Sequence, residues 1–174
     1  MKKLLATLTL LSLVGFGCIV DKAPVPVASD TTYVNAQYGF SLDHTKDVEM
    51  KDRDEKNRAT KYLGLDVDFF TSIRDTVREA KPVNLAFVYA APGLTADAFS
   101  AALVASDPTG AVTVKLAEDV AMGDVTMKKI TSTTQVGTDK IHYLWDDHGT
   151  TIVFSVFIGE NAEFDAILGT LKTL

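Results

Sequence analysis

The chain has 174 residues, of which 47% are hydrophobic and 23% are charged, with a formal net charge of −6 and a single cysteine. Nucleic-acid binding needs a basic face, so this acidic balance argues against it, and it also argues against a polybasic contact with a membrane. The length and the apolar content are sufficient for one domain with a full hydrophobic core.

The N-terminal segment has the three parts of a secretory signal. Met1-Lys2-Lys3 is a short basic head, Leu4 to Phe16 is almost wholly apolar, and Gly17 precedes the only cysteine, Cys18. Gly17-Cys18 resembles a lipobox, in which the cysteine becomes the acylated first residue of a lipoprotein. We expect a signal peptide at residues 1–17 and lipidation at Cys18. The alternatives are cleavage without lipidation and a retained anchor, which is disfavoured because a span needs about 20 apolar residues.

An acylated Cys18 would place the protein in a bacterial cell envelope. Two or more acyl chains, such as palmitate, give a stable membrane anchor. In Gram-negative bacteria an Asp directly after the cysteine retains a lipoprotein at the inner membrane, and this chain has Ile19 there. We therefore expect the outer membrane, facing the periplasm, if the host is Gram-negative. Residues 18–32, with two prolines, read as an extended tether roughly 30–40 Å long, and residues 33–174 as one domain.

Alternating apolar residues predict strands in the first half of the domain, at residues 38–42, 48–50 and 83–89. The charged stretch at residues 51–61 is expected to be an exposed loop. Residues 65–81 fit a strand, a helix or a strand that runs into a helix, with Asp68 as a possible cap. Thr95 is a candidate N-cap of a short helix that carries Phe99 and Leu103 on one side.

The second half shows further strands and a final helix. Strand patterns cover residues 112–116, 125–136, 141–145 and 152–158, and Asp147-His148-Gly149 is expected to form a hairpin turn. Asn161 is a candidate cap for a helix whose apolar stripe runs from Phe164 to Leu171 and docks on the strand at 152–158. The order of elements predicts an α+β fold, a mainly antiparallel sheet flanked by helices.

Three segments resemble one family. They are Tyr33-Val34-Asn35 followed by Tyr38 to Leu42, the hairpin from Ile141 to Ile158, and the helix from Phe164 to Leu171 followed by Lys172-Thr173-Leu174. Together they are similar to the PsbP/DcrB-like domain, the α-β-α sandwich shared with Mog-type proteins. The resemblance implies a scaffold for binding, and no common chemistry.

The strongest metal candidates are His142, Asp146 and His148, beside Asp147. Imidazole and carboxylate groups can hold a transition metal, but the same residue types also occur in ordinary turns. On a strand His142 and Asp146 share a face, whereas a hairpin turn carries His148 away from them.

Other patterns have simpler explanations. Residues 52–57 only partly match a calcium loop, because the glycine and the closing glutamate are missing. Asp66 and Asp68 could pair for acid–base chemistry, although solvent-facing acids on a strand are commoner. Tyr143 and Trp145 alternate with Ile141 and are expected to be core residues rather than a binding stripe.

The sequence favours a membrane-anchored envelope lipoprotein whose domain binds a protein partner or supports an assembly. It contains neither Gly-x-Ser-x-Gly nor His-Glu-x-x-His, so we expect no enzyme activity, no cofactor, no catalytic residue and a monomeric domain. The alternative is a lipoprotein that binds a small ligand or a metal at the Asp146–His148 turn.

Overall fold

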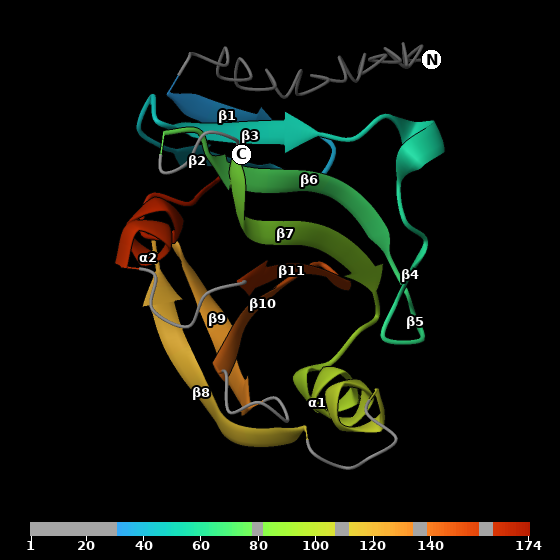
Figure 1. The fold of residues 1–174 in the computed structure, drawn as a ribbon. Coiled ribbons are helices and arrows are strands. Elements are labelled where there is room, and N and C mark those ends of the chain that lie inside the picture. Colours follow the sequence, from blue (N-terminus) through green and yellow to red (C-terminus); the bar gives the residue numbers. More distant parts are fainter. Residues whose placement is uncertain (1–30, 78–81, 107–111, 134–138, 157–161) are drawn as a thin grey trace, which may run out of the picture.

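The computed structural model describes residues 31–77, 82–106, 112–133, 139–156 and 162–174, and all structural statements below refer to these residues (Figure 1). The expected signal peptide, Cys18, most of the tether and the Asn161 cap lie outside them. Among the residues that are described, no helix is both long and apolar enough to cross a membrane.

A large antiparallel sheet forms the centre of the described structure. Its strands lie side by side in the order β3 (Val48–Asp52), β6 (Asp68–Asp75), β7 (Val83–Pro92), β11 (Thr150–Val156), β10 (Asp139–Asp147), β9 (Val125–Thr133) and β8 (Thr113–Met122). The β10–β11 hairpin turns at His148 and Gly149, which both have positive φ, so the turn expected from the sequence is confirmed.

The remaining elements are short. A second sheet contains β1 (Thr32–Asn35), β2 (Phe40–Asp43) and β12 (Lys172–Thr173), and a small hairpin pairs β4 (Lys61–Tyr62) with β5 (Leu65–Asp66). The helices are the 3-10 turn η1 (Glu55–Asn57), α1 (Ala96–Ala105) and α2 (Ala162–Leu168). The Thr95 side chain accepts a hydrogen bond from the Ala98 amide at the start of α1, so the expected cap is confirmed.

The expectation of an α+β sandwich with a sheet flanked by helices is wrong. Strands account for 58% of the structure and helices for 15%. Helix α1 has ten residues and α2 has seven, so neither can cover the sheet. Figure 1 shows the two helices at different places along the curved sheet. The fold is β-rich because residues that could have formed a further helix, at 68–75, form strand β6 instead.

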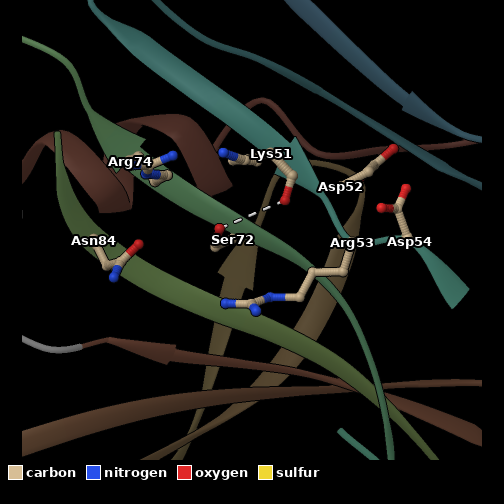
Figure 2. A pocket seen from close by; sticks show the side chains of 7 residues that line it. All are labelled: Lys51, Asp52, Arg53, Asp54, Ser72, Arg74 and Asn84. Atoms are coloured by element: carbon tan, nitrogen blue, oxygen red, sulfur yellow. Dashed lines mark hydrogen bonds between the residues drawn. The ribbon is translucent and has the colours of Figure 1, made fainter. Parts of the chain in front are cut away.

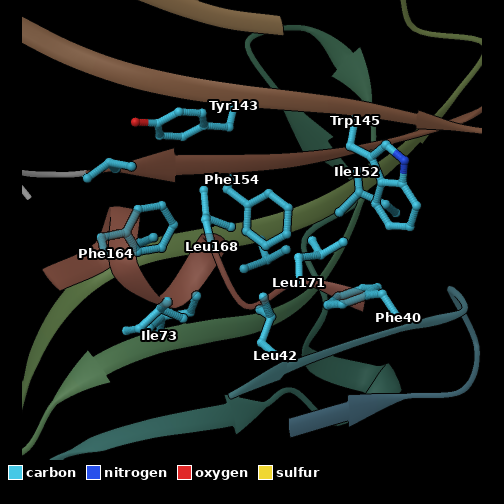
Figure 3. Packing of buried hydrophobic residues seen from close by; sticks show 14 of the residues in the cluster. Phe40, Leu42, Ile73, Tyr143, Trp145, Ile152, Phe154, Phe164, Leu168 and Leu171 are labelled. Carbon is cyan, nitrogen blue, oxygen red and sulfur yellow. The ribbon is translucent and has the colours of Figure 1, made fainter. Parts of the chain in front are cut away.

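Two hydrophobic clusters fill the two faces of the large sheet. The first joins the sheet to β1, β2 and α2, and Figure 3 shows its principal residues: Phe40, Leu42, Ile73, Tyr143, Trp145, Ile152, Phe154, Phe164, Leu168 and Leu171. The second lies under α1 and the β4–β5 hairpin, and its buried members are Val67, Tyr89, Ala91, Phe99, Leu103, Ile130, Leu144 and Val153. The small sheet and α2 therefore share one face, and α1 covers only part of the other.

The C-terminal helix is shorter than expected. Helix α2 ends at Leu168, and Leu171 is fully buried after a turn rather than on the helix. Lys172 and Thr173 then pair with Ser41 and Phe40, so the chain ends as a strand. Phe164 still packs on Phe154 of β11, at 6.4 Å between ring centroids, so the predicted docking of this helix on that strand is confirmed.

Candidate functional site

A pocket of about 350 Å³ lies on the face of the sheet formed by β3, β6 and β7 (Figure 2). We call it the cationic pocket. It is lined by Lys51, Asp52, Arg53, Asp54, Ser72, Arg74 and Asn84. Phe87 and Tyr89 are two residues apart on β7, so their side chains point to the same face of the sheet. Tyr89 belongs to the cluster under α1, which shows that this is the face that α1 covers in part. The pocket therefore opens on the part of that face that α1 leaves uncovered.

The strand register brings these residues together. Lys51 lies opposite Ser72 in the β3–β6 pair, and Arg74 lies opposite Asn84 in the β6–β7 pair. Directly opposed residues in antiparallel strands point to the same face. Side chains from three strands consequently meet on one surface, which Figure 2 shows from close by.

The three cations of the pocket have different partners. Lys51 makes no ion pair with any described residue. Arg53 places its guanidinium 4.4 Å from the centroid of the Phe69 ring, a cation–π contact. Arg74 Nη1 lies 3.5 Å from Glu49 Oε2, and a guanidinium has further donors beyond that single long contact. The pocket therefore presents positive charge that the domain neutralises only in part.

The acidic residues of the pocket lie at the end that also carries Arg53 (Figure 2). Figure 2 shows Asp52 and Asp54 on the side away from Arg74 and Asn84. The Tyr33 hydroxyl donates a hydrogen bond of 2.8 Å to Asp52. Burial, together with the negative charge of Asp52, raises the pKa of the Tyr33 hydroxyl, so this tyrosine stays neutral and keeps the carboxylate engaged.

This arrangement suits the binding of an anion. Lys51 and Arg74 supply positive charge, and the Asn84 amide supplies hydrogen-bond donors. The Ser72 hydroxyl donates only a long bond of 3.5 Å to the Lys51 carbonyl oxygen (Figure 2), so an anion can compete for this donor. Carboxylates accept such bonds more strongly than neutral groups do. The lining contains one hydroxyl, that of Ser72, and no histidine.

The structure separates the metal candidates that the sequence suggested. His142 is 1% exposed and lies under α1, whereas the Asp146 side chain accepts a hydrogen bond from the Gly149 amide in the turn. His148 is 94% exposed, and its Nδ1 lies 2.8 Å from Asp147 Oδ1. In the part of the chain that is described, no group of three or more His, Cys, Asp or Glu side chains could hold a metal ion.

His142 instead belongs to a buried polar network that the sequence did not indicate. Its Nδ1 lies 2.9 Å from the Ser155 hydroxyl, which in turn lies 2.7 Å from the Tyr89 hydroxyl. Its Nε2 is buried and has no hydrogen-bond partner among the described residues, and burial lowers the pKa of His142 to about 4. Although a serine beside a histidine resembles a nucleophile and its base, Ser155 is only 5% exposed, so no substrate reaches it in this structure.

The other acidic candidates have structural roles. Asp66, in β5, pairs with Lys61, and both side chains are largely exposed. Asp68, in β6, accepts hydrogen bonds from Arg58 at 2.8 Å and from the Tyr38 hydroxyl. The two carboxylates therefore serve different contacts instead of forming one acid–base pair.

The segment that partly matches a calcium loop does not form one continuous loop. It includes the end of β3 and the 3-10 turn η1, so the expected exposed loop at residues 51–61 is largely exposed but is not a loop throughout. Lys61 already belongs to β4. Tyr143 and Trp145 are buried in the first cluster, which confirms their assignment to the core.

Comparison with solved structures shows a PsbP-like fold. The chain is similar to the solution structure of cyanobacterial PsbP (CyanoP) from Synechocystis sp. PCC 6803, with a TM-score of 0.53, 11% identity, and coverage of 82% of this chain and 91% of that chain. A crystal structure from Bacteroides thetaiotaomicron VPI-5482 matches with a TM-score of 0.40 and 13% identity, over 83% of this chain and 48% of that chain. No protein-family model and no curated protein sequence matches the chain. At 11% identity the likeness to CyanoP shows the fold alone.

Proposed function

We propose that this chain is a non-catalytic envelope lipoprotein, anchored through an acylated Cys18, whose domain binds an acidic segment of a partner protein in the cationic pocket. The observation that carries the proposal is that three cations, Lys51, Arg53 and Arg74, outnumber the two carboxylates in one pocket of a chain with a net charge of −6. The PsbP-like fold is compatible with a binding scaffold, but it does not by itself indicate a partner.

The charge distribution favours an acidic partner. An acidic segment is repelled by most of an acidic domain and attracted where several cations converge, so the pocket directs where it docks. Ser72 and Asn84 then supply hydrogen bonds beside Lys51. This contrast favours an acidic segment, because a basic segment is repelled by Lys51, Arg53 and Arg74 and is attracted only at the end that carries Asp52 and Asp54.

The expected affinity is moderate. Ion pairs at exposed positions contribute at most about 1 kcal/mol each, and salt weakens them. A partner held by this pocket alone therefore binds reversibly. Anchoring both proteins to one membrane raises their effective concentration, which compensates for a weak single contact.

The experiment is site-specific photocrosslinking in the native envelope. A photoreactive amino acid replaces Asn84 in the full-length lipoprotein, and the crosslinked segment of the partner is sequenced by mass spectrometry. We expect an acidic segment, and we expect its yield to fall at least tenfold in a Lys51→Glu variant.

The matched control is Lys61→Glu, which reverses a similar charge in the β4–β5 hairpin, outside the pocket lining. This variant should leave the crosslink unchanged. Capture of segments without acidic residues, or equal yields in both variants, would refute the proposal.

A further inference from the structure

An aromatic pair borders the cationic pocket on the same face of the sheet. Phe69 of β6 and Phe87 of β7 have ring centroids 4.8 Å apart, tilted by 56°. Phe87 lies directly opposite Ser72, a lining residue of the pocket. Both phenylalanines are half-buried, so their rings remain in part accessible.

Arg53 joins the two parts of this surface. Its side chain lines the pocket, and its guanidinium lies 4.4 Å from the centroid of Phe69. In Figure 2 the side chain extends from the end of β3 across the neighbouring strands. A planar guanidinium that covers one aromatic ring can also stack with an aromatic group of a ligand, which an ammonium cannot do.

We propose that the acidic segment carries an aromatic residue two positions from its acidic residue. This inference rests on the proposed function and specifies the partner's chemistry at the same site. The carboxylate binds Lys51 and the Ser72 hydroxyl, and the aromatic ring lies against Phe87 and the Arg53 guanidinium.

The spacing follows from strand geometry. Neighbouring strands lie about 4.8 Å apart, so Phe87 is one step from Ser72 and two steps, about 10 Å, from Lys51 across the sheet. In an extended peptide, residues i and i+2 point to the same side and are separated by about 7 Å. An acid at i can therefore lie over Ser72, within reach of the long Lys51 side chain, while the aromatic at i+2 lies over Phe87, whereas adjacent residues would point to opposite sides.

The test uses the full-length chain in detergent and three synthetic peptides with identical flanking Gly-Ser sequences. Their central triplets are Glu-Ser-Phe, Glu-Ser-Ala and Gln-Ser-Phe, and binding is measured by isothermal titration calorimetry at low salt. We expect the Glu-Ser-Phe peptide to bind about fivefold more tightly than Glu-Ser-Ala, because it gains the aromatic contacts. The Gln-Ser-Phe peptide should bind weakest.

Two variants assign the aromatic preference to this surface. Arg53→Lys keeps the charge but removes the stacking plane, and Phe87→Leu keeps an apolar side chain but removes the ring. In both, the Glu-Ser-Phe and Glu-Ser-Ala peptides should bind nearly equally. Lys51→Ala should weaken both acidic peptides by the same factor.

The outcomes separate this inference from the proposed function. If the two acidic peptides bind the wild-type chain equally, the aromatic preference is wrong, while acidic recognition stands. If the preference persists unchanged in Arg53→Lys and Phe87→Leu, the ring does not bind here. If neither acidic peptide binds, both the inference and the proposed function are refuted.

Discussion

Gly123, in the turn between β8 and β9, lies directly against the backbone of Leu171. A Cβ atom at Gly123 would overlap the Leu171 carbonyl oxygen and would lie 2.8 Å from the Leu171 amide nitrogen. The next residue, Asp124, donates a backbone hydrogen bond of 3.0 Å to the same carbonyl. The β8–β9 hairpin and the C-terminal segment are therefore held together at a point where only glycine fits.

Replacing Gly123 by alanine should destabilise the domain by about 2–4 kcal/mol. The cost combines a strained backbone, since φ is +57°, with the displacement of the C-terminal segment. Gly64→Ala is the matched control, because Gly64 has φ +78° but a Cβ there would meet none of the described atoms within 4 Å. Chemical denaturation measures the free energy of unfolding of both variants. Gly64→Ala reports the cost of the strained backbone alone, and the additional loss in Gly123→Ala reports the cost of displacing Leu171. Equal losses of stability would show that the close approach to Leu171 is not needed.

Leu168→Ala should lower the free energy of unfolding by about 2–5 kcal/mol, since Leu168 is fully buried in the first cluster. Lys172→Ala should change it by less than about 0.5 kcal/mol, because Lys172 is exposed in β12 and its contact with Asp43 is long. Thermal unfolding followed by circular dichroism compares the two variants. If the melting temperature changed by a small and equal amount in both variants, α2 would not stabilise the sheet.

The stability of the domain should fall in mild acid because of His142. Burial lowers its pKa from 6.5 to about 4. Above pH 6.5 the imidazole is neutral in both the folded and the unfolded chain, so His142 then causes no loss of stability. As the pH falls from 6.5 to 4, the unfolded chain binds a proton that the folded chain does not, and stability drops by up to about 3 kcal/mol.

Among the described residues, no carboxylate counters the effect of burial on the pKa of His142. Lys140 on the same strand lowers its pKa further, and its other neighbours are the Phe99 ring and the Ser155 hydroxyl. Urea denaturation between pH 4 and 7 should therefore show a slope that a His142→Gln variant largely loses. The exposed His148→Gln variant should retain it. An unchanged slope in His142→Gln would assign the acid sensitivity to other groups.

Cys18→Ser should remove acylation and release the protein from membrane fractions. The prediction follows from the signal pattern that precedes Cys18 and from the membrane affinity of two acyl chains. Metabolic labelling with a fatty acid measures it directly. Label that still enters the Cys18→Ser protein would refute the lipoprotein assignment.

The sequence predicted those strands whose pattern is local. Residues 141–145 and 152–156 are largely apolar, because both faces of these strands are buried: Tyr143 and Phe154 lie in the first cluster, and Leu144 and Val153 lie in the second. Residues 65–81 were ambiguous for a physical reason. The register shifts between Phe69 and Thr71, so the two-residue alternation breaks inside β6 and a helical period fits equally well. A helix over these residues would place Val77 on the same side as Phe69 and Ile73, but Val77 is 64% exposed.

The cationic pocket was not predicted because its residues are distant in sequence. Lys51, Arg74 and Asn84 come from three strands, and only the pairing register brings them together. One signal was present, since Val48 and Met50 alternate with Glu49 and Lys51, which places Lys51 on the outer face of a strand. The buried contact between His142 and Ser155 likewise depends on the β10–β11 register, which composition cannot reveal.

The most direct test of the proposed binding site is mapping by nuclear magnetic resonance. The full-length chain, labelled with ¹⁵N in detergent, is titrated with the Glu-Ser-Phe peptide, and changes in amide shifts are followed residue by residue. We predict changes at residues 49–54 of β3 and its following loop, 72–74 of β6 and 84–87 of β7, and none along β8 and β9. Changes centred on another surface, or no change at peptide excess, would contradict binding at the cationic pocket.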